Sequence, residues 1–132
     1  MKVGYKKLIE KTEKNIETKS VDEVAGLLQD EAVTIVDIRD IRELQQEGKL
    51  PGAIHAPRGM LEFWDDPDSP YHRKLFSEDK KFVFYCAGAW RSALATQTVQ
   101  RMGVNNVCHM GGGFTAWKEV ELPIEPVEKK TR

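Results

Sequence analysis

Cysteine and histidine are scarce in this sequence, whose 132 residues include two cysteines, Cys86 and Cys108, and three histidines. Two cysteines cannot form a disulfide framework, and neither a CxxC pair nor clustered histidines supply the ligand spacing of a metal site. The glycines at 111–113 lack the spacing of a phosphate-binding loop, so no nucleotide is indicated. We therefore expect no metal site, and we expect a reducing, cytoplasmic compartment with at least one free thiol.

An excess of one charge and long apolar runs are also missing. The 20 Lys and Arg residues nearly balance the 21 Asp and Glu residues, which leaves a net charge of -1 at pH 7. No strong field attracts nucleic acid, so we expect no nucleic-acid partner. No stretch approaches the roughly 18 apolar residues of a membrane span, and the N-terminus has no apolar core of a secretory signal. We therefore expect no association with membranes.

The sequence contains neither an internal repeat nor a low-complexity linker, which predicts one domain over residues 1–132, with a core of about 16–126 and an N-terminal helical extension. Ser20 and Glu23 fit a capping box at the start of a helix. Residues 58–80 are predicted to be an ordered excursion. Predicted helices cover 4–14, 21–29, 39–48 and 91–103, and a last helix follows a glycine turn within 111–120. Predicted strands cover 32–38, 81–86 and 105–110, and a further short strand follows a Pro-Gly turn within 51–57. This alternation predicts a parallel sheet with helices on both faces.

Cys86 stands at the junction between the predicted strand "KFVFYC" and the following helix. The carboxyl ends of parallel strands are where such sheets bind ligands. A helix N-terminus and the charge of Arg91 are surroundings that lower the pKa of a cysteine thiol from about 8.5 to roughly 3.5–7.5. Gly88 lets successive amides point inward, and the small side chains of Ala87 and Ala89 leave the centre of the loop open. We therefore predict a reactive thiolate, although a buried structural cysteine is the alternative.

Two chemistries fit a thiolate in a cradle of amides. Phosphatases and related arsenate reductases use Cys-x5-Arg, a loop sized for a tetrahedral oxyanion. Here only four residues separate Cys86 from Arg91, and the sixth position after the cysteine is Ser92. The narrower cradle fits a terminal sulfur on Cys86 better than it fits a phosphate.

Four motifs in this order resemble a single-domain rhodanese, a sulfurtransferase, over residues 16–126. They are "VDIRDIRE" (36–43), "GKLPGAIHAP" (48–57), "FVFYCAGAWRSALA" (82–95) and "NNVCHMGGGFTAW" (105–117). The resemblance implies a three-layer α/β/α fold with a central five-stranded parallel sheet. It also implies that a Cys86 persulfide carries sulfur from a donor such as thiosulfate to cyanide or a thiol, without a cofactor. The loop amides that would stabilise the persulfide belong to Ala87, Gly88, Ala89, Trp90, Arg91 and Ser92.

A rhodanese-like module that hands sulfur to a partner protein, without turnover on small acceptors, is the non-enzymatic alternative. The loop also departs from the family pattern Cys-x-Ser-Gly-x-Arg-Ser, because Gly88 occupies the serine position and Ala89 the glycine position. If the fourth position needs a positive φ, Ala89 is strained by roughly 1 kcal/mol, whereas a sharp bend at Gly88 would avoid this strain. The loop hydroxyl at position 88 is absent.

Other residues are candidates for binding a donor. Arg58 follows a predicted strand end, where it could bind a sulfonate or form a surface salt bridge. Trp64 and Trp90 are predicted at the pocket mouth, whereas Phe63 is predicted to pack on the core.

Three acidic and basic residues of the first motif are interpreted as scaffold. Of these, Arg39 and Glu43 are spaced to pair on one helix, and Asp37 precedes them. Cys108 is predicted to be buried, with a resolving role only if it lies near Cys86. The three histidines, His55, His72 and His109, are predicted to face solvent or to be hydrogen-bonded rather than catalytic.

Overall fold

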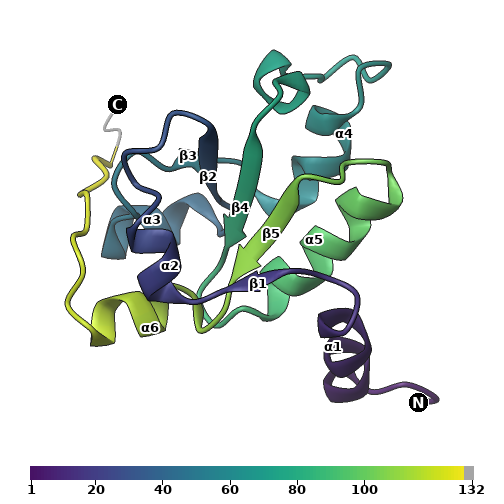
Figure 1. Ribbon diagram of the computed structural model, residues 1–132, viewed down its shortest axis with the longest axis horizontal. Coiled ribbons are helices and arrows are strands. Elements are labelled where there is room, and N and C mark those ends of the chain that lie inside the picture. The colour runs from purple at the N-terminus through teal and green to yellow at the C-terminus, as the bar shows by residue number, and fades with distance from the viewer. Residues whose placement is uncertain (130–132) are drawn as a thin grey trace.

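The computed structural model describes residues 1–129, so the last three residues of the predicted domain lie outside the described part. The described chain contains a five-stranded sheet in the order β1-β5-β4-β2-β3, and every pair of neighbours is parallel (Figure 1). This confirms the predicted parallel sheet. The strands are β1 Thr18–Lys19, β2 Val33–Asp37, β3 Ile54–His55, β4 Lys81–Tyr85 and β5 Val107–Met110.

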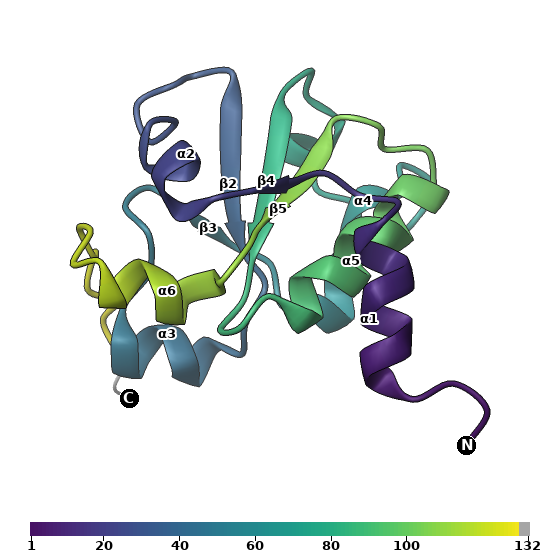
Figure 2. The ribbon, with the colours of Figure 1, turned by 60° about the horizontal axis from the view of Figure 1, so that its bottom comes forward.

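Helices cover both faces of the sheet and complete the predicted three layers. Figures 1 and 2 show α2, α3 and α6 on one side of the sheet, with α1, α4 and α5 on the other. None of the helices within residues 1–129 has both the length and the apolar composition needed to cross a bilayer. The α-helices are α1 Tyr5–Glu13, α2 Val21–Ala25, α3 Ile41–Glu47, α4 Leu61–Asp65, α5 Trp90–Arg101 and α6 Gly113–Glu119, and 3-10 turns cover Arg58–Met60 and Lys74–Ser77.

The helix starts follow from local sequence. The Ser20 side chain accepts a hydrogen bond from the Glu23 amide at 3.1 Å, and the Glu23 carboxylate accepts one from the Ser20 amide at 3.0 Å. This confirms the predicted capping box. Asp40 and Glu43 form a second capping box at the start of α3. Helix α3 stops before Gly48, whose φ of 83° is a conformation that favours glycine.

The core divides between the two faces because successive strand residues point to opposite sides. In β4 and the residue after it, Phe82, Phe84 and Cys86 face the side of α4 and α5. Val83 and Tyr85 face the side of α2 and α6. The loop that follows β4 therefore begins directly from a strand buried on both faces.

Some predicted boundaries are wrong for identifiable reasons. Strand β1 was not predicted, because Thr18–Lys19 carries no apolar pattern and forms a strand only by pairing with His109 and Met110. By contrast, residues 51–57 agree with the prediction, because a turn with Gly52 at φ 75° comes first and the short strand β3, Ile54–His55, follows it. The helix predicted over 21–29 ends at Ala25, where a series of turns replaces it. The 58–80 excursion is ordered, as predicted, and contains α4 and both 3-10 turns.

A buried ion pair joins β2 to the helical layer beside it. Arg39 and Asp37 are both fully buried, with Arg39 Nη2 2.9 Å from Asp37 Oδ2. The other Nη2 hydrogen bond goes to the Gly48 carbonyl at 2.7 Å. The predicted helical pair of Arg39 and Glu43 is wrong, because Arg39 precedes the Asp40 cap and so lies outside α3. The scaffold interpretation of Asp37 and Arg39 agrees with their burial.

We predict that Arg39→Met destabilises the protein by about 3 kcal/mol or more, because it leaves the buried Asp37 carboxylate without a counter-charge. Urea unfolding at pH 7 measures the loss. Arg42→Met is the matched control, since the Arg42 side chain is 81% exposed and its ion pair with Asp40 is screened by solvent, so this variant should lose little stability. Equal losses of stability in Arg39→Met and Arg42→Met would contradict the conclusion that the buried pair of Arg39 and Asp37 stabilises the fold.

Candidate active site

The loop after β4 lies where the connections of the sheet diverge. From β2 the chain adds β3 on one side, whereas from β4 it adds β5 on the other, and β2 and β4 are neighbours. Such a switch point is where open parallel sheets bind ligands. Cys86 directly follows β4 there and is only 1% exposed. It lies in a pocket of about 370 Å³ whose other lining residues are Ala87, Gly88, Trp90 and Arg91.

The Cys86 sulfur faces the first turn of α5. The Ser92 amide donates a hydrogen bond to Cys86 Sγ at 3.3 Å, and Ser92 Oγ lies 3.6 Å from the same sulfur. The unpaired amides at a helix N-terminus carry partial positive charge, which favours an anion at this position. The arrangement can therefore stabilise a thiolate, or a sulfur anion one bond further out.

Ala89, and not Gly88, adopts the left-handed conformation in the loop. Its φ is 75° and its ψ is -5°, whereas Gly88 is not among the residues with positive φ. The bend is therefore made at the fourth loop position, and an alanine there costs about 1 kcal/mol or more. With no hydroxyl at position 88, the hydroxyl that remains in the loop is that of Ser92, the last serine of the family pattern, which also donates to the Ala89 carbonyl at 3.3 Å.

A chain of polar side chains continues behind Ser92. Ser92 Oγ lies 2.9 Å from His109 Nδ1, and His109 Nε2 lies 3.0 Å from Thr18 Oγ1. His109 is 1% exposed, and burial lowers its pKa to about 4, so the imidazole is neutral at pH 7. The prediction that His109 is hydrogen-bonded is confirmed. Its connection to Cys86 through Ser92 was not predicted, because Ser92 in α5 and His109 in β5 are 17 positions apart and meet only when the helix packs on the sheet.

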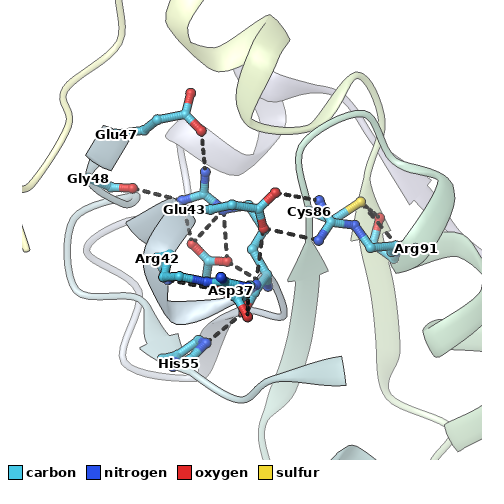
Figure 3. Close-up of polar contacts among 11 residues, drawn as sticks. Asp37, Arg42, Glu43, Glu47, Gly48, His55, Cys86 and Arg91 are labelled. Carbon is cyan, nitrogen blue, oxygen red and sulfur yellow. Dashed lines mark hydrogen bonds and ion pairs between the residues drawn. The ribbon is translucent and has the colours of Figure 1, made fainter. Parts of the chain in front are cut away.

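The Arg91 guanidinium turns away from the loop toward α3. Its two terminal nitrogens bind both Glu43 carboxylate oxygens, each at 3.0 Å (Figure 3). The hydrogen bond with Arg91 lowers the pKa of Glu43, and the same bond raises the pKa of Arg91. Glu43 thus does more than cap its own helix, since it fixes the arginine beside Cys86.

The N-terminus of α6 holds the outer side of the loop. Phe114 and Thr115 donate backbone hydrogen bonds to the carbonyls of Cys86 and Ala87, at 2.8 and 3.0 Å. A Cβ at Gly113 would lie 2.4 Å from the Ala87 carbonyl oxygen, so only glycine allows this approach. Of the glycines at 111–113, Gly113 is thereby explained by its close packing against the loop.

Comparison with known proteins assigns the family. Residues 20–120 match the Rhodanese-like domain. The chain belongs to the rhodanese-like domain family. A structure from Rhodopseudomonas palustris, described as a protein of unknown function and possible tyrosine phosphatase, is 49% identical, with a TM-score of 0.91 over 95% of this chain and 96% of that one. The human single-domain sulfurtransferase TSTD1 is 29% identical, with a TM-score of 0.66 over 79% of this chain and 96% of that one.

Curated relatives extend the comparison to longer proteins. The mouse thiosulfate sulfurtransferase/rhodanese-like domain-containing protein 3 is 28% identical over 80% of this chain and 71% of its own length. A putative sulfur carrier protein from Bacillus subtilis is 26% identical over 67% of this chain, which spans only 43% of that protein. The family is therefore shared with proteins that carry additional segments.

In this rhodanese-like fold, two of the predicted donor-binding residues lie away from the pocket lining. Arg58 Nη1 binds Glu62 at 2.8 Å on the surface, which is the salt bridge that the sequence left open. Trp64 packs against Phe76 and the Arg73 guanidinium. The predicted packing of Phe63 is wrong, because its side chain is 52% exposed on the outer face of a short helix. Of the predicted aromatic residues, Trp90 lines the pocket.

The second cysteine of the rhodanese-like domain lies on the other face of the sheet. Cys108 is fully buried among residues packed against α2 and α6, as predicted, whereas Cys86 belongs to the core beside α5. Burial raises the pKa of the Cys108 thiol to about 11. Neither cysteine forms a disulfide, and residues 1–129 contain no group of three or more His, Cys, Asp or Glu side chains arranged to hold a metal ion.

We predict that Ala89→Gly raises the free energy of unfolding by up to about 1 kcal/mol, because it removes the left-handed strain while adding some unfolded-state entropy. The matched control is Ala87→Gly in the same loop, where φ is not positive, so only the entropic loss of about 0.5–1 kcal/mol remains. Urea unfolding measures both. A loss of stability in Ala89→Gly as large as in the control would refute the strain.

We also predict that His109 makes stability fall with acidification. Its folded pKa of about 4 lies below the unfolded value of about 6.5, so the unfolded state binds a proton first. The contribution is intact above about pH 6.5 and is lost as the pH falls toward 4. Between pH 7 and pH 5 the wild type should lose about 2 kcal/mol more than His109→Gln, as measured by urea unfolding. Equal losses of stability in the wild type and in His109→Gln would show that His109 is not the source of the pH dependence.

Proposed function

We propose that this rhodanese-like protein is a sulfurtransferase that carries sulfur as a persulfide on Cys86, in a cytoplasmic compartment that keeps the thiol reduced. The observation that carries the proposal is the contact of Cys86 Sγ with the Ser92 amide at the start of α5, inside a pocket. Amides of residues 87–92 supply positive partial charge where the outer sulfur anion would develop. The sulfurtransferase names of human and mouse relatives support the same chemistry.

The proposed reaction has two displacements. The Cys86 thiolate attacks the outer sulfur of a donor such as thiosulfate, the sulfur–sulfur bond of the donor breaks, and sulfite leaves with the electron pair. An acceptor, cyanide or a thiolate, then attacks the outer sulfur of the persulfide and releases the Cys86 thiolate. Arg58 and Trp64 have no part in this proposal, because one is paired with Glu62 and the other is packed on Phe76.

A sulfur-carrier role is the second candidate, and the similarity to a putative sulfur carrier protein of Bacillus subtilis favours it. A carrier would load Cys86 in the same way but would discharge to a partner protein. Slow discharge to free cyanide beside fast discharge to a protein thiol would select the carrier role.

Phosphatase chemistry suits the site less well, although the Rhodopseudomonas palustris protein is described as a possible tyrosine phosphatase. Four residues separate Cys86 from Arg91, one fewer than in the Cys-x5-Arg loop. The Arg91 guanidinium is also bound to Glu43 through both terminal nitrogens, which reduces its capacity to bind a phosphate. We expect no release of phosphate from an aryl phosphate.

The proposal is tested by the intact mass of the protein after incubation with thiosulfate and, separately, with inorganic polysulfide. We expect the wild type and Cys108→Ser to gain one sulfur atom that a reducing agent removes, and we expect Cys86→Ser to gain none. Cys108→Ser is the matched control because it removes the thiol that is buried on the opposite face. A sulfur gain in Cys86→Ser, or no gain in any form of the protein with either donor, would overturn the proposal.

A further inference from the structure

An apolar groove adjoins the candidate active site. It has a volume of about 230 Å³ and is lined by Tyr5, Ile9, Trp90, Arg91 and Leu94. Trp90 and Arg91 also line the pocket that contains Cys86, so the groove and the pocket adjoin each other at the first turn of α5. Trp90 and Tyr5 are 56% and 54% exposed, which is high for aromatic side chains in contact with one another. The groove is therefore open apolar surface next to a buried nucleophile.

Helix α1 builds one wall of this groove from outside the family domain. It spans Tyr5–Glu13, whereas the Rhodanese-like domain match begins at residue 20. The helix is fixed against α5 by the buried Ile9 and by a hydrogen bond from Thr12 Oγ1 to Gln97 Oε1 at 2.9 Å. Figures 1 and 2 both show α1 lying beside α5. The N-terminal extension therefore adds a surface to the site that the family domain alone does not supply.

The one positive charge that lines the Cys86 pocket and the groove, that of Arg91, is nearly cancelled by Glu43. Arg91 carries the only charged side chain among the residues that line them, apart from an ionised Cys86. Both terminal nitrogens of Arg91 bind Glu43, and its aliphatic stem is the part left to contact a ligand. A carboxylate or sulfonate on the body of a substrate would find no free counter-charge in the groove, whereas an aromatic or branched alkyl body would bury apolar area against Tyr5, Trp90 and Leu94.

We propose that this groove binds the apolar body of an organic thiol that accepts sulfur from Cys86, an inference that rests on the proposed function. The acceptor thiolate attacks the outer sulfur of the Cys86 persulfide. The bond from that sulfur to Cys86 Sγ breaks, its electron pair leaves with Sγ, and the acceptor departs as an organic persulfide anion. No net oxidation takes place and no co-reactant is needed. Occupation of the groove brings the acceptor sulfur toward a thiol that is itself only 1% exposed.

The test loads the protein with sulfur and follows the loss of that sulfur by intact mass after addition of a thiol. The probes are benzyl mercaptan, neutral 2-mercaptoethanol and anionic 2-mercaptoethanesulfonate. For each thiol, the rate of sulfur removal from the protein is divided by the rate of its reaction with free cysteine persulfide, which corrects for the intrinsic reactivity of the thiol. We expect benzyl mercaptan to exceed both others by about tenfold, the gain from burying one aromatic ring. Tyr5→Ala and Leu94→Ala should each remove most of that gain, with less than about twofold effect on 2-mercaptoethanol.

Leu8→Ala is the matched control, because Leu8 lies on α1 and is 42% exposed but does not line the groove. Circular dichroism and urea unfolding verify that each variant is folded. If the protein loads sulfur but the three thiols differ by less than twofold, or if Leu8→Ala acts like Leu94→Ala, the groove proposal is overturned and the sulfurtransferase proposal stands. If a protein thiol removes sulfur faster than benzyl mercaptan, the acceptor is a protein and the proposal of a small organic acceptor is wrong. Failure to load sulfur would overturn both proposals.

Discussion

The buried guanidinium of Arg39 holds together the elements that surround the candidate active site. It pairs with Asp37 at the end of β2, binds the Gly48 carbonyl at the end of α3 and lies 4.3 Å from the ring centroid of Phe114 in α6. A charge in this position needs every one of its partners, because desolvation is compensated only by hydrogen bonds and counter-charges. The positions of α3 and α6 are therefore coupled to the end of the central strand.

Both helices then act on the cysteine loop. Helix α3 supplies Glu43, which binds Arg91 in the first turn of α5, and α6 donates amides to the carbonyls of residues 86 and 87. The loop is thus held from two sides, while its inner side faces the pocket. This support explains how a left-handed alanine persists at position 89, since local strain survives where surrounding contacts fix the backbone.

Much of the fold could be predicted from local sequence. The apolar runs of β2 and β4, the Ser20 capping box and the position of Cys86 at a strand end depend on neighbours in the chain, and each is found in the structure. What was missed depends on residues far apart in sequence. Ser92 meets His109 17 positions away, Arg91 meets Glu43 48 positions away, and Thr18 meets His109 91 positions away. Composition and periodicity carry no record of such pairings. Arg39 does not pair with Glu43 as predicted, because it lies before the start of α3, and its Nη1 is instead 3.4 Å from Glu47 Oε1.

The central claim is that a Cys86 persulfide is an intermediate in sulfur transfer. The most direct measurement mixes sulfur-loaded protein rapidly with an acceptor thiol, quenches at successive times and compares the rate of sulfur loss from Cys86 with steady-state turnover under the same conditions. The account predicts that the single discharge is at least as fast as turnover, because every catalytic cycle passes through it. A discharge slower than turnover would show that sulfur reaches the acceptor by another route and would contradict the claim.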